Sequence, residues 1–345
     1  MFRRVRRSDL DRVREIFIAA FREEYGRRGV DIGAQVSRWK RAYPLLRLLA
    51  QFPNPYQHAL NLHVWEEEGR VAGFIMTSPG NRERTRWHID FVAVAPDAQG
   101  RGLGARLVEG IFDHYGARGV KLFTLEVDQD NAPALRFYDK LGFRRYASVT
   151  YYTREAPPPP PAVLTVGFRP MGAEDAGAVF EMHVGSQPAA VRHIDSRTRA
   201  DFAWGLPERA VAGLRRALGH QDDQRWVLEE GGRPVAWLRV LAQLRPLPHT
   251  VHLLALPGQE HQYPRLLEKA AEVLASFPPR QVLAWASDHT PAKQQALLAW
   301  GLAPLTVDHS LVRDSLITIK LPAHGQPAVG LGDDTGFKPC FTQRG

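Results

Sequence analysis

The chain is poor in cysteine: Cys340 is the only one among 345 residues. One cysteine cannot form an internal disulfide, and without a His/Cys cluster nothing in the sequence indicates a metal site. Long apolar runs are also absent, which argues against a membrane-spanning helix or a secretory signal sequence. We therefore expect a soluble, cytoplasmic protein that uses no metal and is stabilised by ordinary hydrophobic cores.

Acidic residues are fewer than basic ones. The 45 Lys and Arg residues outnumber the 37 Asp and Glu residues, which gives a formal net charge of +8 at pH 7 and a pI of about 9.8. A basic surface permits contact with nucleic acid, but no helix-turn-helix, zinc-finger or RNP-like motif accompanies it. We do not expect a nucleic-acid partner, and positive potential of this kind is better suited to attracting an anionic cofactor.

Five consecutive prolines interrupt the middle of the chain. They predict an extended, semi-rigid spacer between two domains, and 345 residues are enough for two ordinary hydrophobic cores. The expected organisation is a first domain at 1–155, a linker at 156–162, a second domain at 163–321 and a flexible, Gly- and Pro-rich tail at 322–345.

The most informative stretch is IDFVAVAPDAQGRGLGARLV, residues 89–108. Its first six residues, Ile89–Val94, are rich in β-branched and aromatic side chains and predict a buried strand. A helix is expected from about Gly104 onward, and the three glycines among the six residues Gln99–Gly104 let the backbone approach a ligand. The amides and dipole at a helix start favour an anion, and Arg101 and Arg106 add positive charge. The stretch therefore predicts a phosphate site.

The spacing of this loop points to a family. Gln99, Gly102 and Gly104 fit the pattern Q/R-x-x-G-x-G/A, whereas G-x-G-x-x-G is not matched and no Gly-Lys-Ser/Thr follows. The loop resembles the pyrophosphate loop of the GCN5-related N-acetyltransferases, the GNAT family. Residues 125–143, LEVDQDNAPALRFYDKLGF, resemble the second half of the same family's core.

This resemblance implies a fold, a co-substrate and a set of ligand-binding residues. The fold would be α/β (α+β), with two tandem GNAT domains, each a mixed, mostly antiparallel sheet flanked by helices. Acetyl-CoA would be the co-substrate and an amine the acceptor. The residues expected to bind acetyl-CoA are Phe91, Val92, Val94, Gln99, Gly100, Arg101, Gly102, Leu103, Gly104, Ala105, Asn131 and Tyr138.

Hydrophobic patterning predicts the elements around this loop. Residues 2–6 alternate like a strand, and Ser8 is the expected cap of a helix. Glu67–Arg70 is the expected turn of a hairpin, and Lys121–Val127 is expected to be a strand parallel to the central one and splayed from it. In the family the pantetheine arm lies in this V-shaped opening. The insertion Arg27–Leu60 is interpreted either as the acceptor side or as an amphipathic helix covering the sheet.

Acetyl transfer needs a neutral amine and an acid for the departing thiolate. An amine of pKa near 10.4 is neutral in only about one molecule in a few thousand at pH 7, a cost of roughly 4–5 kcal/mol. Glu126 is the first candidate base, because N-terminal amine acetyltransferases of this family carry a working glutamate in the same Leu-Glu-Val context. A salt bridge is its alternative role. Asp90 and His88 are the other candidate bases, and either can instead orient the acceptor.

Tyr138 stands in the Tyr-x-x-x-Gly-Phe context in which the family carries its general acid. A phenol can protonate a forming thiolate, although a tyrosine on a helix can also be a plain core residue. Asn131 is expected to cap the following helix and to contact the cofactor arm.

The second half of the chain looks like a degenerate copy of the first. Gly142 and Gly301 are 159 positions apart, as are Arg154 and Arg313. The glycine loop is lost, because residues 257–264, PGQEHQYP, hold one glycine. At the same offset the site residues are replaced: Glu126 by Trp285, Asn131 by Thr290 and Tyr138 by Leu297. We expect no cofactor there, and a role in packing on the first domain, shaping the acceptor cleft or forming a homodimer.

The leading hypothesis is an acetyl-CoA-dependent N-acetyltransferase with one active site, in the first domain. The acceptor is left open between small-molecule amines and protein N-termini. A non-catalytic acyl-CoA-binding regulator or scaffold is the alternative hypothesis.

Overall fold

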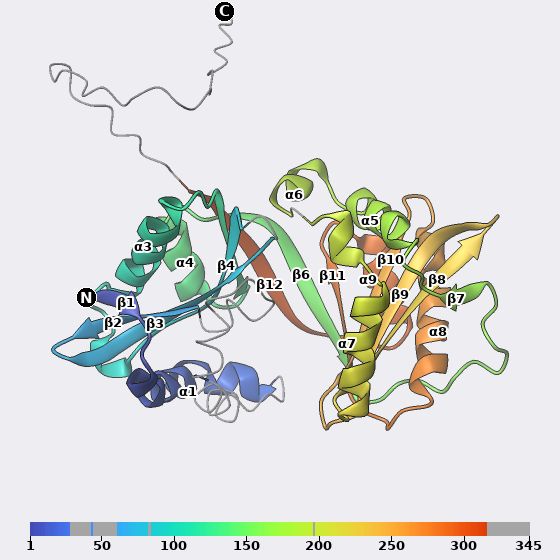
Figure 1. Cartoon of the computed structure of the whole chain (residues 1–345), viewed down its shortest axis with the longest axis horizontal. Coiled ribbons are helices and arrows are strands. Elements are labelled where there is room, and N and C mark those ends of the chain that lie inside the picture. The colour runs from blue at the N-terminus through green and yellow to red at the C-terminus, as the bar shows by residue number, and fades with distance from the viewer. Residues whose placement is uncertain (28–42, 44–60, 82–83, 196, 316–345) are drawn as a thin grey trace, which may run out of the picture. The chain divides into compact units, whose positions relative to one another are not determined.

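The structure is a computed structural model that describes residues 1–27, 43, 61–81, 84–195 and 197–315 (Figure 1). Residues 1–315 form one compact unit. The tail predicted at 322–345, Cys340, and most of the insertion Arg27–Leu60 lie outside the described residues. None of the helices in the described ranges is both long enough and apolar enough to span a membrane.

The first half follows the predicted order of elements, with one exception near its start. Ser8 does not cap α1, because it lies inside a short 3-10 turn, Arg7–Asp9, where the Asp9 carboxylate accepts a hydrogen bond from the Arg6 amide at 2.6 Å. The elements are β1 (Phe2–Arg4), α1 (Leu10–Arg27), β2 (Leu62–Glu67), β3 (Arg70–Pro79), β4 (Arg86–Val94), α3 (Leu103–Gly116), β5 (Leu122–Asp128), α4 (Ala132–Lys140) and β6 (Arg144–Arg154).

The second half repeats the succession of strands, and helices α5, α6 and α7 follow its first strand. That strand is shorter than the alternation over 163–170 predicts: β7 begins only at Phe168, and the side chains of Val163, Leu164 and Val166 are exposed. The elements are β7 (Phe168–Pro170), α5 (Ala176–Gly185), α6 (Ala189–Ile194), α7 (Leu206–Ala217), β8 (Gln221–Glu230), β9 (Arg233–Gln243), β10 (His249–Ala255), α8 (Tyr263–Leu274), β11 (Val282–Ser287), α9 (Pro291–Ala299) and β12 (Ala303–Asp314).

All twelve strands belong to a single sheet of order β1-β2-β3-β4-β5-β12-β6-β11-β10-β9-β8-β7. The last strand of each half is exchanged: β12 lies between β5 and β6, and β6 lies between β12 and β11 (Figure 1). The mixed α/β fold class is confirmed. The sequence did not predict that the sheets of the two halves join through their exchanged strands.

Helices cover both faces of the sheet in each half and bury apolar side chains against it. In the first half, α1 packs on one face through Val13, Ile16 and Phe17, and α3 packs on the opposite face through Leu107 and Ile111. The second half has the same two cores, one beneath α5 and the other beneath α8 and α9. The two faces of β4 are therefore both buried, which fixes this strand at the centre of the first half.

A β-bulge interrupts β4. Its register with β3 passes from Thr77–Ile89 to Met76–Phe91, so Asp90 is the extra residue. The bulge reverses the alternation of side chains, because Ile89 faces the core beneath α3 whereas Phe91 faces the core beneath α1. Bulges of this kind bend a strand and redirect its side chains. β10, the corresponding strand of the second half, pairs with β9 in unbroken register.

Each half contains a partly buried ionic cluster of the same composition. In the first half, Arg3 binds Asp9 at 2.6 Å and also binds Glu66. In the second half, Arg169 binds Asp175 at 2.7 Å and Glu229 at 2.8 Å. In both clusters the aspartate follows the arginine by six positions and the glutamate comes from the next strand to pair with it.

Candidate active site

The glycine loop forms an open turn at the start of α3. Gly100 and Gly102 have φ angles of +77° and +74°, a left-handed backbone that glycine adopts without strain. A Cβ atom at either position would meet no atom within 4 Å, so there is free space beside the turn. No side chain caps the first turn of α3, and Gln99 ties the loop to β4 by donating to the Val94 carbonyl at 3.3 Å. The loop thus presents uncapped helix amides to an open surface.

The two arginines expected to add positive charge have different surroundings. Arg101 lies 3.4 Å from the Glu67 carboxylate and donates to the Asp97 carbonyl at 2.5 Å. Arg106 lies 5.6 Å from the centre of the Trp65 ring and has no acidic partner among the described residues. Of the two arginines, Arg106 is therefore the one whose positive charge is not offset by a nearby carboxylate of a described residue.

Strands β4 and β5 diverge towards the loop. They pair in parallel from Arg86–Leu122 to His88–Thr124 and no further. Beyond His88 the edge of β4 that faces β5 has no strand partner among the described residues. The side chains of Phe91, Val92 and Val94 pack into the two cores, so at these positions only the backbone can bond a ligand in the opening. This agrees with the predicted V-shaped fork.

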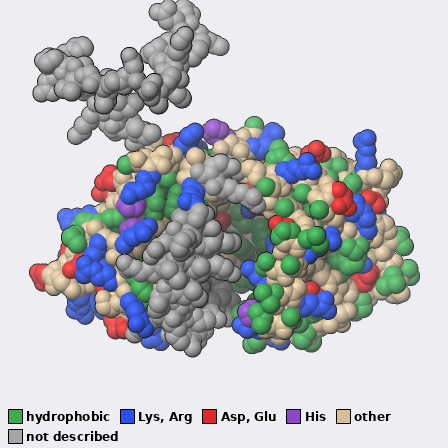
Figure 2. All heavy atoms as spheres, in the orientation of Figure 1, with side chains coloured by type: hydrophobic (Ala, Val, Ile, Leu, Met, Phe, Trp, Pro, Cys, Tyr) green, Lys and Arg blue, Asp and Glu red, His purple; other side chains and the backbone are tan. Residues whose placement is uncertain are grey.

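A cavity of about 350 Å³ opens at the root of the fork. His88 and Thr124, the last paired residues, both line it, and His88 Nδ1 lies 3.2 Å from Thr124 Oγ1. Glu126, two residues further along β5, is exposed to the cavity and accepts a hydrogen bond from the Tyr151 hydroxyl at 3.1 Å. The face shown in Figure 2 is hollowed near its middle, and basic side chains are interspersed with neutral and acidic ones there.

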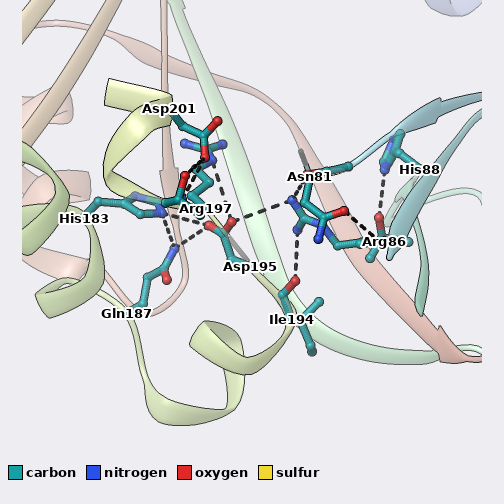
Figure 3. Close-up of polar contacts among 12 residues, drawn as sticks. Asn81, Arg86, His88, His183, Gln187, Ile194, Asp195, Arg197 and Asp201 are labelled. Carbon is teal, nitrogen blue, oxygen red and sulfur yellow. Dashed lines mark hydrogen bonds and ion pairs between the residues drawn. The ribbon is translucent and has the colours of Figure 1, made fainter. Parts of the chain in front are cut away.

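The second half supplies one wall of this cavity. Arg86 of β4 donates to the carbonyl of Ile194, at the end of α6, at 3.1 Å (Figure 3). The next residue, Asp195, lies 3.8 Å from the same guanidinium and 2.9 Å from His183 Nε2. Burial opposes ionisation of Asp195, but the bond to His183 and the charge of Arg197 outweigh it and hold the pKa of Asp195 well below its usual range.

Asp90 is buried at the bulge and does not line the cavity that holds Glu126. Ser78 donates a hydrogen bond to its Oδ1 at 2.8 Å, while Oδ2 is buried without a partner. Burial raises the pKa of Asp90 to about 6. His88 has the opposite response: burial, helped by the charge of Arg86, lowers its pKa to about 4, so the ring is neutral at pH 7.

Tyr138 lies on α4, away from that cavity, and packs against Phe137 and Phe143 with ring centres 4.9 and 5.5 Å away. Burial raises the pKa of its phenol, and the hydroxyl has no hydrogen-bond partner among the described residues. The Phe137 ring lies 3.3 Å from the position of a Cβ on Gly104, so this helix adjoins the glycine loop. Asn131 caps α4 as predicted, accepting from the Ala134 amide at 3.1 Å.

Several cavity residues were not identified from the sequence. Tyr151 faces Glu126 from β6, and the alternation of β6 was the one signal that could have placed it on this face. The second-half residues carried no signal, because they approach Glu126 only through strand exchange. They include His183, Asp195, Arg197, His252, Trp285 and Lys293. Within the described ranges no group of three or more His, Cys, Asp or Glu side chains is placed to hold a metal ion.

Comparison with known proteins agrees with this geometry. Residues 10–143 match the model of the Acetyltransferase (GNAT) family. A mycothiol acetyltransferase of Thermomonospora curvata is 37% identical over 118 residues, which are 34% of this chain and 38% of that protein. The [ribosomal protein bS18]-alanine N-acetyltransferase of Salmonella typhimurium is 40% identical over 92 residues, 27% of this chain and 60% of that protein. The chain thus spans less than two thirds of either relative's length.

Solved structures share the fold over nearly the whole chain. A GCN5-related N-acetyltransferase from Sphaerobacter thermophilus superposes with a TM-score of 0.60 at 14% identity, covering 91% of this chain and 95% of that one. A putative acetyltransferase from Pyrococcus horikoshii gives a TM-score of 0.51 at 14% identity, covering 92% and 90%.

Proposed function

Starting from the match of residues 10–143 to the GNAT acetyltransferases, we propose that the chain is an N-acetyltransferase with one acetyl-CoA site, in residues 1–155. The acceptor is an amine, either of a small molecule or of a protein N-terminus. The relatives include a mycothiol acetyltransferase and a [ribosomal protein bS18]-alanine N-acetyltransferase, so both kinds of acceptor are kept in the proposal.

One observation carries the proposal: the fork between β4 and β5 connects the glycine loop with the cavity that holds Glu126. The pyrophosphate of acetyl-CoA would accept hydrogen bonds from the amides of Gln99–Gly104 and the first turn of α3. The pantetheine arm would pair with the free edge of β4 beyond His88, as an added strand does. The thioester would then lie near the root of the fork, within reach of an amine in the cavity.

Glu126 is the proposed general base and Tyr138 the proposed general acid. Glu126 is solvent-accessible in the cavity and can take a proton from the attacking ammonium, directly or through water. Tyr138 carries its proton at neutral pH, because the pKa of a phenol is near 10 and burial raises it further, so the hydroxyl can donate to the thiolate of CoA. Asp90, whose pKa of about 6 suits a base, is the alternative to Glu126.

We propose that the second half, from residue 163 through β12, is a duplicated GNAT domain that has lost its cofactor site. The repeated ionic cluster and the exchanged strands support the duplication. In its loop the Glu260 carboxylate accepts a hydrogen bond from the Gly258 amide at 3.1 Å, so an acidic side chain stands where a phosphate would bind. Residues 156–162 remain the proposed linker and 322–345 the proposed tail.

The fork of the second half is occupied by aromatic side chains. β10 and β11 pair in parallel only at His249–Val282 and Thr250–Leu283. Trp285 lies two residues beyond the last pair, as Glu126 does in the first half, and stacks on His252 with ring centres 5.0 Å apart. Through α6 and Asp195 this half shapes the acceptor cavity of the first half.

Calorimetric titration of acetyl-CoA into the full chain tests the proposal. We expect one tight site per chain, abolished in a Gly102→Glu, Gly104→Glu variant because two carboxylates enter the phosphate site. Gly258→Glu is the matched control: Gly258 has a φ of +84° and open space beside it, as Gly102 does, and binding should be unchanged.

Each other result is informative. Two acetyl-CoA sites per chain would contradict the proposal that the second half has lost its site. No binding of acetyl-CoA would refute the proposed acetyltransferase activity. A chain that binds acetyl-CoA but acetylates none of a broad panel of amines would be a scaffold instead.

A further inference from the structure

Lys293, on the first turn of α9, is buried without a counter-ion. Its side chain lines the cavity, the residue is 6% exposed, and it has no hydrogen bond or ion pair with another described residue. Lys269 is equally buried, but its ammonium binds Glu272 at 2.5 Å. Because an ammonium removed from water is unfavourable unless paired, the isolation of Lys293 calls for a ligand.

The backbone at Lys293 lacks a partner too. In α4 the Asn131 side chain caps the amide of Ala134, and 159 positions later the corresponding residues are Thr290 and Lys293. Thr290 does not cap α9, because its hydroxyl donates to the Ser287 carbonyl at 2.9 Å. Pro291, at the first helical position, has no amide hydrogen. The positive end of α9 and the Lys293 side chain therefore meet in one cavity with no acid bound to either.

The carboxylates around the cavity are engaged elsewhere. Asp195 binds His183 and Gln187, and Glu126 accepts from Tyr151. Asp288, next to α9, accepts from the Ser148 amide at 3.1 Å. Burial alone lowers the pKa of Lys293 to about 7, with no contribution from any acid. A single anion supplied from outside would compensate both positive features at once.

We infer that Lys293 Nζ and the uncapped amides at the start of α9 bind a carboxylate or phosphate group of the acyl acceptor. The acceptor is then a small molecule that carries an amine and an anionic group together. Glu126 lines the same cavity, and about 350 Å³ lies at the small end of the range of ligand sites, roughly 300–1,000 Å³. This inference rests on the proposed acetyl transfer, because Glu126 defines the reacting end of the acceptor.

Anion binding can be tested without any transfer reaction. The full chain, without acetyl-CoA, is treated with a neutral N-hydroxysuccinimide ester at pH 7.5, and acylation of each lysine is followed by peptide mass spectrometry. Inorganic phosphate or acetate should slow acylation of Lys293 about tenfold at an anion concentration of ten times its Kd. Lys269 is the matched control and should be unaffected, and NaCl at equal ionic strength should protect neither residue.

The acceptor assignment is tested by kinetics with matched pairs: amino acids and the amines that remain after their decarboxylation. Lys293→Met should raise the KM for the acid-bearing acceptor by about 10–100-fold, the loss of one charge-assisted hydrogen bond, and leave the KM of the plain amine unchanged. Lys293→Arg keeps the positive charge, so it should raise the KM for the acid-bearing acceptor less than Lys293→Met does. The split between the two acceptors separates binding from a general structural defect.

The outcomes distinguish the two proposals. If neither phosphate nor acetate protects Lys293, the anion site is refuted. Protection without a KM split refutes the assignment to the acceptor. If no amine is acetylated but Lys293 is protected, the proposed enzyme fails whereas the anion site stands.

Discussion

Replacing Lys293 by methionine should stabilise the ligand-free protein. Methionine has a similar length and no charge, so it fills the same buried space without the need for a counter-ion. Burial lowers the pKa of Lys293 from 10.5 to about 7. At 1.36 kcal/mol per pKa unit this fall of about 3.5 corresponds to at most about 5 kcal/mol of destabilisation by the charged form.

The pH dependence gives the sign of this effect. Between pH 7 and pH 10.5 the unfolded chain carries a proton on Lys293 that the folded chain has released, so the stability of the wild type rises with pH. Below pH 7 the full penalty is present, and above pH 10.5 it disappears. The advantage of Lys293→Met should therefore shrink from roughly 4–5 kcal/mol at pH 7 to about 2 kcal/mol at pH 9. His252 is already neutral in this range, because burial and the charge of Lys293 lower its pKa.

Urea unfolding of both proteins at pH 7, 8 and 9, in a buffer free of phosphate and carboxylate, measures this difference. Lys269→Met is the control and should have the opposite sign, since it removes the counter-ion of Glu272 and the cation that lies 4.2 Å from the Trp226 ring. A Lys293→Met protein that is less stable than the wild type at pH 7, or whose advantage does not change with pH, would refute the reasoning.

Three further substitutions test the proposed catalytic groups. Glu126→Gln should lower kcat about 10²–10⁴-fold with little change in acetyl-CoA affinity, measured by steady-state kinetics and calorimetry; an unchanged kcat would exclude Glu126 as the base. Tyr138→Phe keeps the packing on Phe143 and should lower kcat about 10²-fold, most strongly with poor thiol leaving groups, whereas equal effects on all acyl donors would contradict an acid role. Asp90→Asn should retain most activity, and a large loss of kcat would make Asp90 the base instead. Because burial raises the pKa of Asp90 to about 6, the variant should also be more stable than the wild type at pH 8 by about 1–3 kcal/mol. This gain in stability should fade as the pH falls from 6 towards 4.

The strand, glycine loop and helix at 89–116 were predictable because their signals are local. A β-branched run, glycines in a tight turn and a helical period each follow from the backbone preferences of neighbouring residues. The bulge at Asp90 was not predictable from the same stretch. It is visible only when the registers of β3 and β4 are compared, and the opposite orientations of Ile89 and Phe91 then explain why the two side chains pack into different hydrophobic cores.

The composition of the cavity depended on non-local pairing. The alternation of apolar and polar side chains over 303–314 predicts a strand, β12, but does not identify its neighbours. Because β12 pairs with β5 rather than with a strand of its own half, Ser310 lies opposite Glu126. Nothing in the sequence distinguishes Lys293 from an ordinary lysine on the solvent-facing side of a helix. Its burial results from the docking of α9 beside β11, a contact that no pattern within the helix specifies.

The strand exchange also makes the order of synthesis matter. About 150 residues separate β6 from β12, so at the usual 5–20 residues per second a ribosome needs roughly 10–30 seconds to deliver the strand that lies beside β5. Until then Glu126 lacks the strand partner that it has in the finished fold, because its partner Ser310 belongs to β12 and the pairing of β5 with β4 ends at Thr124. A nascent chain can thus complete its glycine loop early, yet the strand that carries Glu126 is fixed in place only after the second half has been made.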